Sequence, residues 1–322
     1  MKTKDIEKVK GRYNISLYDE YIILFGNRLL IFHTDGSMVA NKKELRNIRK
    51  VISISKDIVL VDCGSQKAYI ALSLCDGSEI WRVSHPKLDY TSRCFSISPD
   101  NTVVYDYYEF EGSKYFARID LVAKELVVFL LEEGLRCVSD LTCDENGIPC
   151  LLEHHYEIVG EKHISANGIR YIYEDCINPG NAYHWKYKWA FDFPTISKFF
   201  LGNCETILTK DLLVYQPKNG NSYHLLGEEE RAQLPKSEPF GWNITHNKQY
   251  IILIYKEMNV VIDLITKTLV ARYNTDFYHG CLIGNKYWIS SDDGIIIKPF
   301  PLIEDTPAKK NVFWNPNDQC KL

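Results

Sequence analysis

Residues 92–132 read SRCFSISPDNTVVYDYYEFEGSKYFARIDLVAKELVVFLLE and contain four short runs of β-forming residues. A Ser-Pro-Asp-Asn turn at 98–101 separates the first two runs, and Glu-Gly-Ser at 111–113 separates the second from the third. Apolar and polar residues alternate over 115–120, which is typical of a strand with one buried face. The segment therefore predicts four antiparallel strands joined by tight turns in one meander.

The same order of strands and turns recurs along the whole chain. Copies of the 92–132 unit occupy approximately residues 13–40, 51–83, 137–173, 196–226, 241–273 and 278–322. The middle residues of the second strands are Ile23, Leu60, Tyr105, Leu151, Ile207, Ile252 and Trp288, and their spacing averages about 44 residues. Four strands per unit at this period are typical of a β-propeller. The sequence thus predicts an all-β fold, a seven-bladed β-propeller of four-stranded antiparallel blades, forming a single domain over 1–322.

The last unit has no obvious fourth strand, and one terminus is expected to supply it and so close the ring, because an open ring would leave two sheet edges unpaired. The two candidate segments are residues 5–9 and 311–314. Helix is scarce. About two turns are expected over 42–50, where Lys42, Arg46, Arg49 and Lys50 would share one face, and another short helix over 228–233.

Two stretches resemble known propeller repeats. Residues 71–81, ALSLCDGSEIW, resemble the hairpin between the third and fourth strands of quinoprotein-type (PQQ-like) repeats, with Ser73 and Asp76 at the usual Asp and Thr positions. Residues 95–100, FSISPD, are similar to the first turn of WD-repeat blades, although the chain contains no Trp-Asp and no Gly-His dipeptide. The resemblance implies the propeller fold and matches no single family.

Composition and motifs limit the functional classes. The formal net charge of −4 supplies no field to attract nucleic acid or an anionic membrane, so neither partner is expected. The longest apolar runs span six residues, far short of the about 20 that a membrane helix needs. The first ten residues alternate charges unlike a secretory signal, and the ten cysteines form no Cys-x-x-Cys pair, which favours reduced core thiols in a cytoplasmic protein.

Familiar catalytic and cofactor motifs are missing from the chain. It has no Gly-x-Gly pair, no Gly-Lys-Ser/Thr loop and no Gly-x-Ser-x-Gly elbow. Cys137, Cys143 and Cys150 are spaced by six and seven residues, which does not suit a zinc knuckle. We therefore expect no cofactor and no bound metal, and an enzyme is the less favoured reading.

An aromatic stretch lies within the longest gap between repeats. Residues 181–189 read NAYHWKYKW, so aromatic residues alternate with lysines in the second half of the stretch. The candidate contact residues of this stretch are Tyr183, His184, Trp185, Tyr187 and Trp189. Extra residues in a repeat usually form a loop on the binding face, and Tyr and Trp dominate interaction hot spots. The alternation equally predicts a strand with its aromatic side chains buried in the blade and its lysines in water. Base stacking on single-stranded nucleic acid is a third reading, which the overall charge disfavours.

A second polar stretch holds Glu153, His154 and His155. Together with His246 these residues are the candidates for a catalytic cluster at the mouth of a central channel. Neighbouring residues on a strand point to opposite faces, however, so His154 and His155 are not expected to share one site.

We therefore predict a non-catalytic protein–protein interaction platform in a cytoplasmic assembly, with the five aromatic-stretch residues as its partner site. The alternative is a small-molecule hydrolase of the lactonase type.

Overall fold

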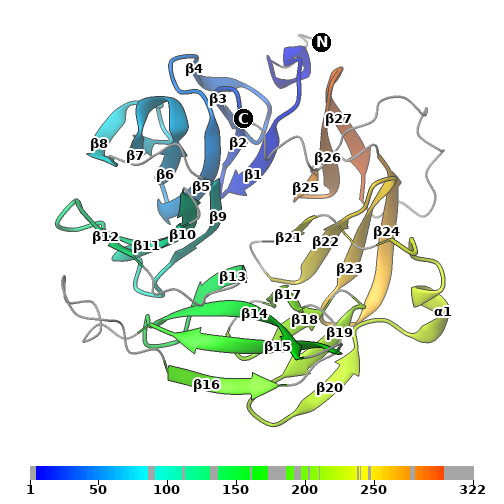
Figure 1. The fold of residues 1–322 in the computed structure, drawn as a ribbon. Helices are drawn as coiled ribbons and strands as arrows, with labels where there is room; N and C mark the ends of the chain where they lie inside the picture. The colour runs from blue at the N-terminus through cyan, green and yellow to red at the C-terminus, as the bar shows by residue number, and fades with distance from the viewer. Residues whose placement is uncertain are drawn as a thin grey trace. The chain divides into compact units, whose positions relative to one another are not determined.

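The structure is a computed structural model. It describes residues 5–85, 91–110, 113–130, 137–159, 162–172, 186–191, 197–201, 204–209, 211–237, 239, 241–245, 248–275 and 280–300. These residues form seven antiparallel sheets whose strands follow one another in chain order (Figure 1). The predicted seven-bladed β-propeller is confirmed.

The chain divides into two compact units, each described by itself. Unit 2 comprises Phe25–Leu29 and Val39–His224 and holds four sheets. The second sheet is β5 (Ile48–Ser55), β6 (Ile58–Cys63), β7 (Ala68–Ser73) and β8 (Glu79–Ser84), with the 3-10 helix η2 (Gly64–Gln66). The third is β9 (Thr91–Ile97), β10 (Val103–Phe110), β11 (Ser113–Asp120) and β12 (Glu125–Leu130). The fourth is β13 (Cys137–Cys143), β14 (Pro149–Val159), β15 (Lys162–Tyr171) and β16 (Lys186–Phe191), and the fifth is β17 (Ser197–Phe200), β18 (Ile207–Thr209), β19 (Leu213–Gln216) and β20 (Asn221–His224).

Unit 1 comprises Met1–Leu24, Leu30–Met38 and Leu225–Leu322, and holds most of the first sheet with the sixth and seventh. The first sheet is β1 (Asn14–Tyr18), β2 (Tyr21–Phe25), β3 (Leu29–His33) and β4 (Met38–Lys42). The sixth is β21 (Gly241–Ile244), β22 (Tyr250–Ile254), β23 (Met258–Asp263) and β24 (Thr268–Asn274), and the seventh is β25 (Gly280–Ile283), β26 (Lys286–Ser291) and β27 (Gly294–Pro299). The helices are η1 (Asp5–Lys8) and α1 (Glu228–Arg231), the latter within the predicted 228–233 segment.

Position within a sheet explains which runs are apolar. The middle strands β2 and β6 read YIILF and IVLVDC and are almost completely buried, because neighbouring side chains cover both of their faces. The last strands β8 and β20 are mostly exposed and carry polar residues. In unit 2, Leu60 and Tyr69 of the second sheet pack with Val104 and Ile119 of the third in one core cluster. A core between successive sheets therefore helps to hold unit 2 together.

The N-terminal segment departs from the prediction. Residues 5–8 form η1 rather than a strand, while 311–314 lie outside the described residues. Within unit 1 the chain after η1 contacts the seventh sheet: the Gly11 N–H donates to the Asp292 carbonyl at 3.2 Å, and the Tyr13 N–H to Ser290 Oγ at 2.7 Å. Arg12 adds a bidentate pair with the Asp292 carboxylate at 2.6 and 2.8 Å. The segment thus joins the first and seventh sheets without adding a strand.

The expected helix over 42–50 was wrong. Lys42 ends β4, Ile48 begins β5, and the connection between them is a turn. Asn47 has φ of 58°, in the left-handed region that interrupts a helix, and the Ile48 N–H bonds to the Gly26 carbonyl at 2.8 Å. Tertiary hydrogen bonding therefore overrides the helical spacing of the basic residues.

Two hairpin turns between third and fourth strands share one design. Asp120 accepts hydrogen bonds from the N–H groups of Val122 and Ala123 at 3.0 and 2.8 Å, and Asp263 accepts the equivalent pair from Ile265 and Thr266 at 2.8 and 2.9 Å. Each turn then needs a residue in the left-handed region: Lys124 and Lys267 both have φ of 58°.

We expect Lys124→Gly and Lys267→Gly each to raise the free energy of unfolding by about 0.5–1 kcal/mol, because glycine adopts this conformation without Cβ strain. Urea titration of each variant measures the change. Lys124→Ala and Lys267→Ala retain the Cβ and should show no gain; a glycine variant less stable than the wild type would contradict the strain argument.

Candidate functional site

The predicted aromatic partner site is only partly described. Tyr183, His184 and Trp185 lie outside the described residues, whereas Tyr187 and Trp189 belong to β16. The fourth sheet therefore continues to Phe191, and two of the five residues lie in a strand rather than in an inserted loop. β16 is the last strand of its sheet: Trp189 lies opposite Ile169 and Tyr187 opposite Arg170, with a bulge between the pairs.

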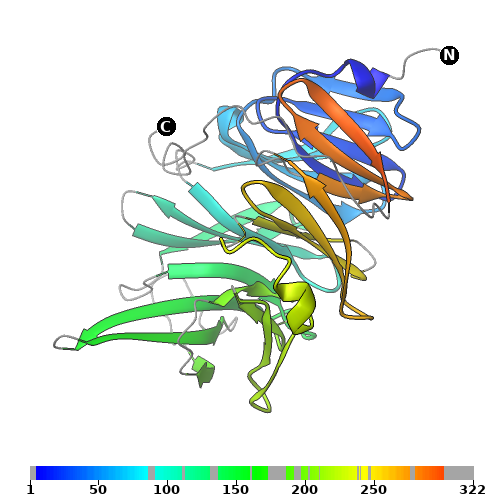
Figure 2. The same cartoon turned by 90° about the vertical axis from the view of Figure 1, so that its right-hand side faces the viewer.

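The second predicted cluster lies on the long β14–β15 hairpin, drawn in green in Figure 2. Glu153 is fully buried, so its carboxylate does not line an open site. His154 and His155 occupy successive positions of β14, opposite Asn167 and Ala166, as the strand prediction required. His246 lies outside the described residues. Over the described part of the chain, no group of three or more His, Cys, Asp or Glu is placed to hold a metal ion.

Unit 2 contains a groove of about 400 Å3 between its third and fourth sheets. The lining comes from two turns at equivalent places in successive repeats, from positions in β10, β11 and β14, and from the residue after β15. Its residues are Ser98, Pro99, Asp100, Thr102, Val103, Tyr105, Arg118, Glu145, Asn146, Gly147, Ile148, Pro149 and Ile172. The volume falls within the range of natural ligand pockets, about 300–1,000 Å3.

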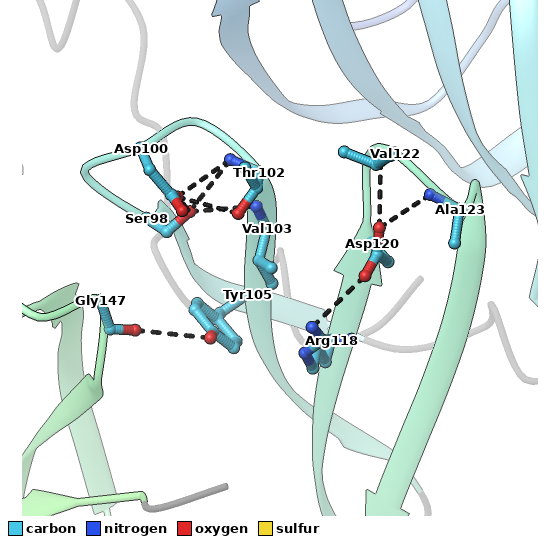
Figure 3. A network of polar contacts seen from close by, with 10 residues as sticks. All are labelled: Ser98, Asp100, Thr102, Val103, Tyr105, Arg118, Asp120, Val122, Ala123 and Gly147. Atoms are coloured by element: carbon cyan, nitrogen blue, oxygen red, sulfur yellow. Dashed lines mark hydrogen bonds and ion pairs between the residues drawn. The ribbon is translucent and has the colours of Figure 1, made fainter.

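The wall from the third sheet is the turn between β9 and β10. The Ser98 hydroxyl donates to Asp100 Oδ1 at 2.6 Å, and the Thr102 N–H and hydroxyl donate to the same oxygen at 3.1 and 2.9 Å (Figure 3). These hydrogen bonds, that of Ser98 first, lower the pKa of the Asp100 carboxyl. A fully ionised carboxylate therefore stands at the edge of the groove at neutral pH.

The wall from the fourth sheet is the turn between β13 and β14. Asp144 Oδ1 accepts hydrogen bonds from the N–H groups of Asn146 and Ile148 at 2.9 and 2.8 Å. Gly147 has φ of 80°, a conformation that suits glycine. The Glu145 side chain between these residues is exposed and adds a second carboxylate at the groove.

One hydrogen bond joins the two walls, and a basic residue lies beside it. The Tyr105 hydroxyl donates to the Gly147 carbonyl at 3.4 Å, so the third sheet holds the turn of the fourth (Figure 3). Arg118 lies opposite Tyr105 in the β10–β11 ladder, and its Nη2 contacts the Asp120 carboxylate at 3.3 Å. The arrangement can hold a short extended ligand that combines apolar and charged groups.

Sequence reasoning found the turn at 98–101 but not the groove. The two motifs, Ser-Pro-Asp-Asn at 98–101 and Asp-Glu-Asn-Gly at 144–147, begin 46 residues apart, close to one repeat period. Turns spaced by one repeat period occupy equivalent places in successive blades. This spacing therefore indicates that the two turns lie side by side in a propeller.

No family model matches this chain, and no curated protein matches its sequence. Solved structures do. A streptogramin B lyase matches with a TM-score of 0.59 and 11% sequence identity, over 92% of this chain and 94% of that chain. The β-propeller domain of Cps50 (Swd1) from Myceliophteria thermophila matches with a TM-score of 0.56 and 10% identity, over 90% of this chain and 98% of that one. These structural matches support the propeller fold. At sequence identities this low, they carry no activity over to this chain.

Proposed function

We propose that the protein is a non-catalytic platform for a protein partner and that the groove between its third and fourth sheets receives a short segment of that partner. The observation that carries the proposal is the groove itself, whose two walls are turns held by side-chain hydrogen bonds. A site that is already ordered loses little conformational entropy on binding.

The charges of the groove suggest what the segment contains. Asp100 and Glu145 contribute two carboxylates, while Pro99, Ile148 and Ile172 contribute apolar surface. Arg118 already contacts Asp120. The complementary segment therefore presents a lysine or arginine beside an apolar side chain.

The aromatic stretch remains part of the proposal. Lys186 pairs with Tyr171, and the next residue after Tyr171 is Ile172, which lines the groove. The stretch Tyr183, His184 and Trp185 is joined to the chain directly before Lys186, and Tyr187 and Trp189 follow it. We therefore propose that the aromatic residues extend the contact with the partner along the last strand of the fourth sheet. The assembly that the two proteins form is proposed to be cytoplasmic.

Selection from a phage-displayed random peptide library on the full chain tests the groove. Enriched peptides should carry a basic residue next to an apolar one, and Glu145→Lys should weaken their binding about tenfold, since one favourable charge contact becomes repulsive. Glu205→Lys is the matched control, because Glu205 is an exposed residue between β17 and β18, the equivalent turn of the fifth sheet.

The groove would be rejected as the binding site if Glu145→Lys and Glu205→Lys lost peptide affinity equally. It would also be rejected if the enriched peptides bound Glu145→Lys as tightly as the wild type. Trp185→Ala/Trp189→Ala tests the aromatic extension in the same assay. Unchanged binding by that folded double variant would limit the contact to the groove.

A further inference from the structure

Two buried thiols meet in unit 2 between the fourth and fifth sheets. Cys150 lies in β14, and Cys204 precedes β18; their exposed fractions are 0% and 3%. Both pack in one core cluster with Tyr171, Phe200 and Ile207. The two cysteines are 54 positions apart in the sequence, so only the packing of the two sheets brings them together.

The sulfur of Cys204 accepts a hydrogen bond from the Tyr171 hydroxyl at 3.6 Å. Tyr171 lies opposite Cys150 in the β14–β15 ladder, and the Cys150 thiol donates to the Ile148 carbonyl at 3.3 Å. Donors of this kind stabilise a thiolate more than a thiol.

The two sulfurs consequently differ in acidity. The neighbouring Cys150 side chain, helped by the hydrogen bond from Tyr171, lowers the pKa of Cys204 to about 7 against the opposing effects of burial and of the Asp144 and Glu205 carboxylates. Burial, followed by the proximity of Cys204, raises the pKa of Cys150 well above its ordinary value. At neutral pH Cys204 is therefore partly ionised, while Cys150 keeps its proton.

We propose that Cys150 and Cys204 form a reversible disulfide that links the fourth and fifth sheets when the protein meets a hydroperoxide. The Cys204 thiolate attacks one peroxide oxygen, the O–O bond breaks, and a sulfenic acid and hydroxide form. The Cys150 sulfur then attacks the sulfenic sulfur, the S–OH bond breaks, and the Cys150 proton leaves with that hydroxyl as water. In total two thiols lose two hydrogens, and hydrogen peroxide is reduced to two waters.

Two other cysteines are less suited to the attacking role. Burial raises the pKa of Cys143 to about 12 and that of Cys281 to about 12, so both remain thiols. Cys75 is exposed and serves as the internal reference for oxidation at the surface. Because both sulfurs of the pair are buried, a small oxidant such as hydrogen peroxide is expected to react far faster than glutathione disulfide.

The test oxidises the full chain with hydrogen peroxide, blocks the remaining thiols with N-ethylmaleimide, and maps the peptides by mass spectrometry. We expect a cross-linked peptide that contains Cys150 and Cys204, has lost two hydrogens, and is released by dithiothreitol. If both cysteines are recovered as N-ethylmaleimide adducts while Cys75 is oxidised, the proposal is wrong.

A conservative variant tests the role of the hydrogen bonds without removing either sulfur. Tyr171→Phe deletes one donor to Cys204 and should slow disulfide formation at pH 7 by up to about tenfold, because the thiolate fraction falls toward that of an ordinary cysteine. The pH midpoint of the rate should move upward from about 7. Tyr273→Phe, which removes a hydroxyl that donates to the Pro299 carbonyl in unit 1, is the matched control. An unchanged rate and midpoint in Tyr171→Phe would overturn the assignment of Cys204 as the attacking thiolate.

Discussion

Replacing Gly280 with alanine is expected to lower the free energy of unfolding by about 3 kcal/mol or more. Gly280 is buried at the start of β25, and a Cβ on it would overlap the phenol ring of Tyr287. Tyr287 cannot move aside easily, because it is fully buried and stacks on Tyr273 with ring centroids 4.0 Å apart. An added methyl group therefore disrupts the core shared by the sixth and seventh sheets.

Gly241→Ala is the matched control for this prediction. Gly241 begins β21, the equivalent strand of the sixth sheet, and its added Cβ would meet only Ile254 Cδ1, at an ordinary 3.6 Å. Urea titration followed by tryptophan fluorescence should show a large loss for Gly280→Ala and a change within about 0.5 kcal/mol for Gly241→Ala. Similar losses in the two variants would show that the contact with Tyr287 is not the cause.

Replacing Arg49 with methionine is expected to cost about 3 kcal/mol, since it leaves a buried carboxylate without its cation. Asp62 is 0% exposed, and its Oδ1 accepts a hydrogen bond from Arg49 Nη2 at 2.5 Å. Within the described chain, Asp62 Oδ2 is buried and has no hydrogen-bond partner. Arg49→Met/Asp62→Asn removes the charge as well and should recover most of the loss; a double variant as unstable as Arg49→Met would mean that lost packing of the arginine dominates.

The same substitution should make stability depend more steeply on pH. Burial raises the pKa of Asp62 in the folded protein, and the Arg49 charge opposes that rise, so removing Arg49 raises the pKa further. The unfolded carboxyl titrates near 3.9, so between that pH and the folded pKa the native state binds more protons. Stability then falls as the pH increases through this window. The deficit of Arg49→Met, measured by urea titration, should be larger at pH 8 than at pH 4; a deficit independent of pH would contradict the burial argument.

Much of the fold follows from local sequence patterns. The strands of residues 92–132 were predictable because period-2 alternation and turn residues act over only a few positions, and the third sheet follows that prediction closely. The fourth sheet was harder, because its last strand begins at Lys186, after a segment that the repeat spacing did not anticipate. The helix expected over 42–50 failed for the opposite reason: its charges had helical spacing, but Ile48 and Asn47 had tertiary partners.

The candidate groove and the thiol pair depended on contacts between sheets. The 98–101 turn was visible as a turn, yet nothing in it indicates that Gly147 accepts the Tyr105 hydroxyl, 42 positions away. Similarly, the sequence marked Cys150 only as one of three cysteines whose spacing does not suit a zinc knuckle, whereas in the structure Cys150 packs in one core cluster with Cys204.

By itself, the sequence determined the repeat, its period and the strands of most blades, because these depend on alternation and turn chemistry between neighbouring residues. Only the tertiary structure decided which side chains meet: Tyr105 with Gly147 and Cys150 with Cys204 between blades, and Arg49 with Asp62 across a bulged ladder within one blade. The physical reason is that a packed interior selects partners by shape and hydrogen bonding rather than by distance along the chain.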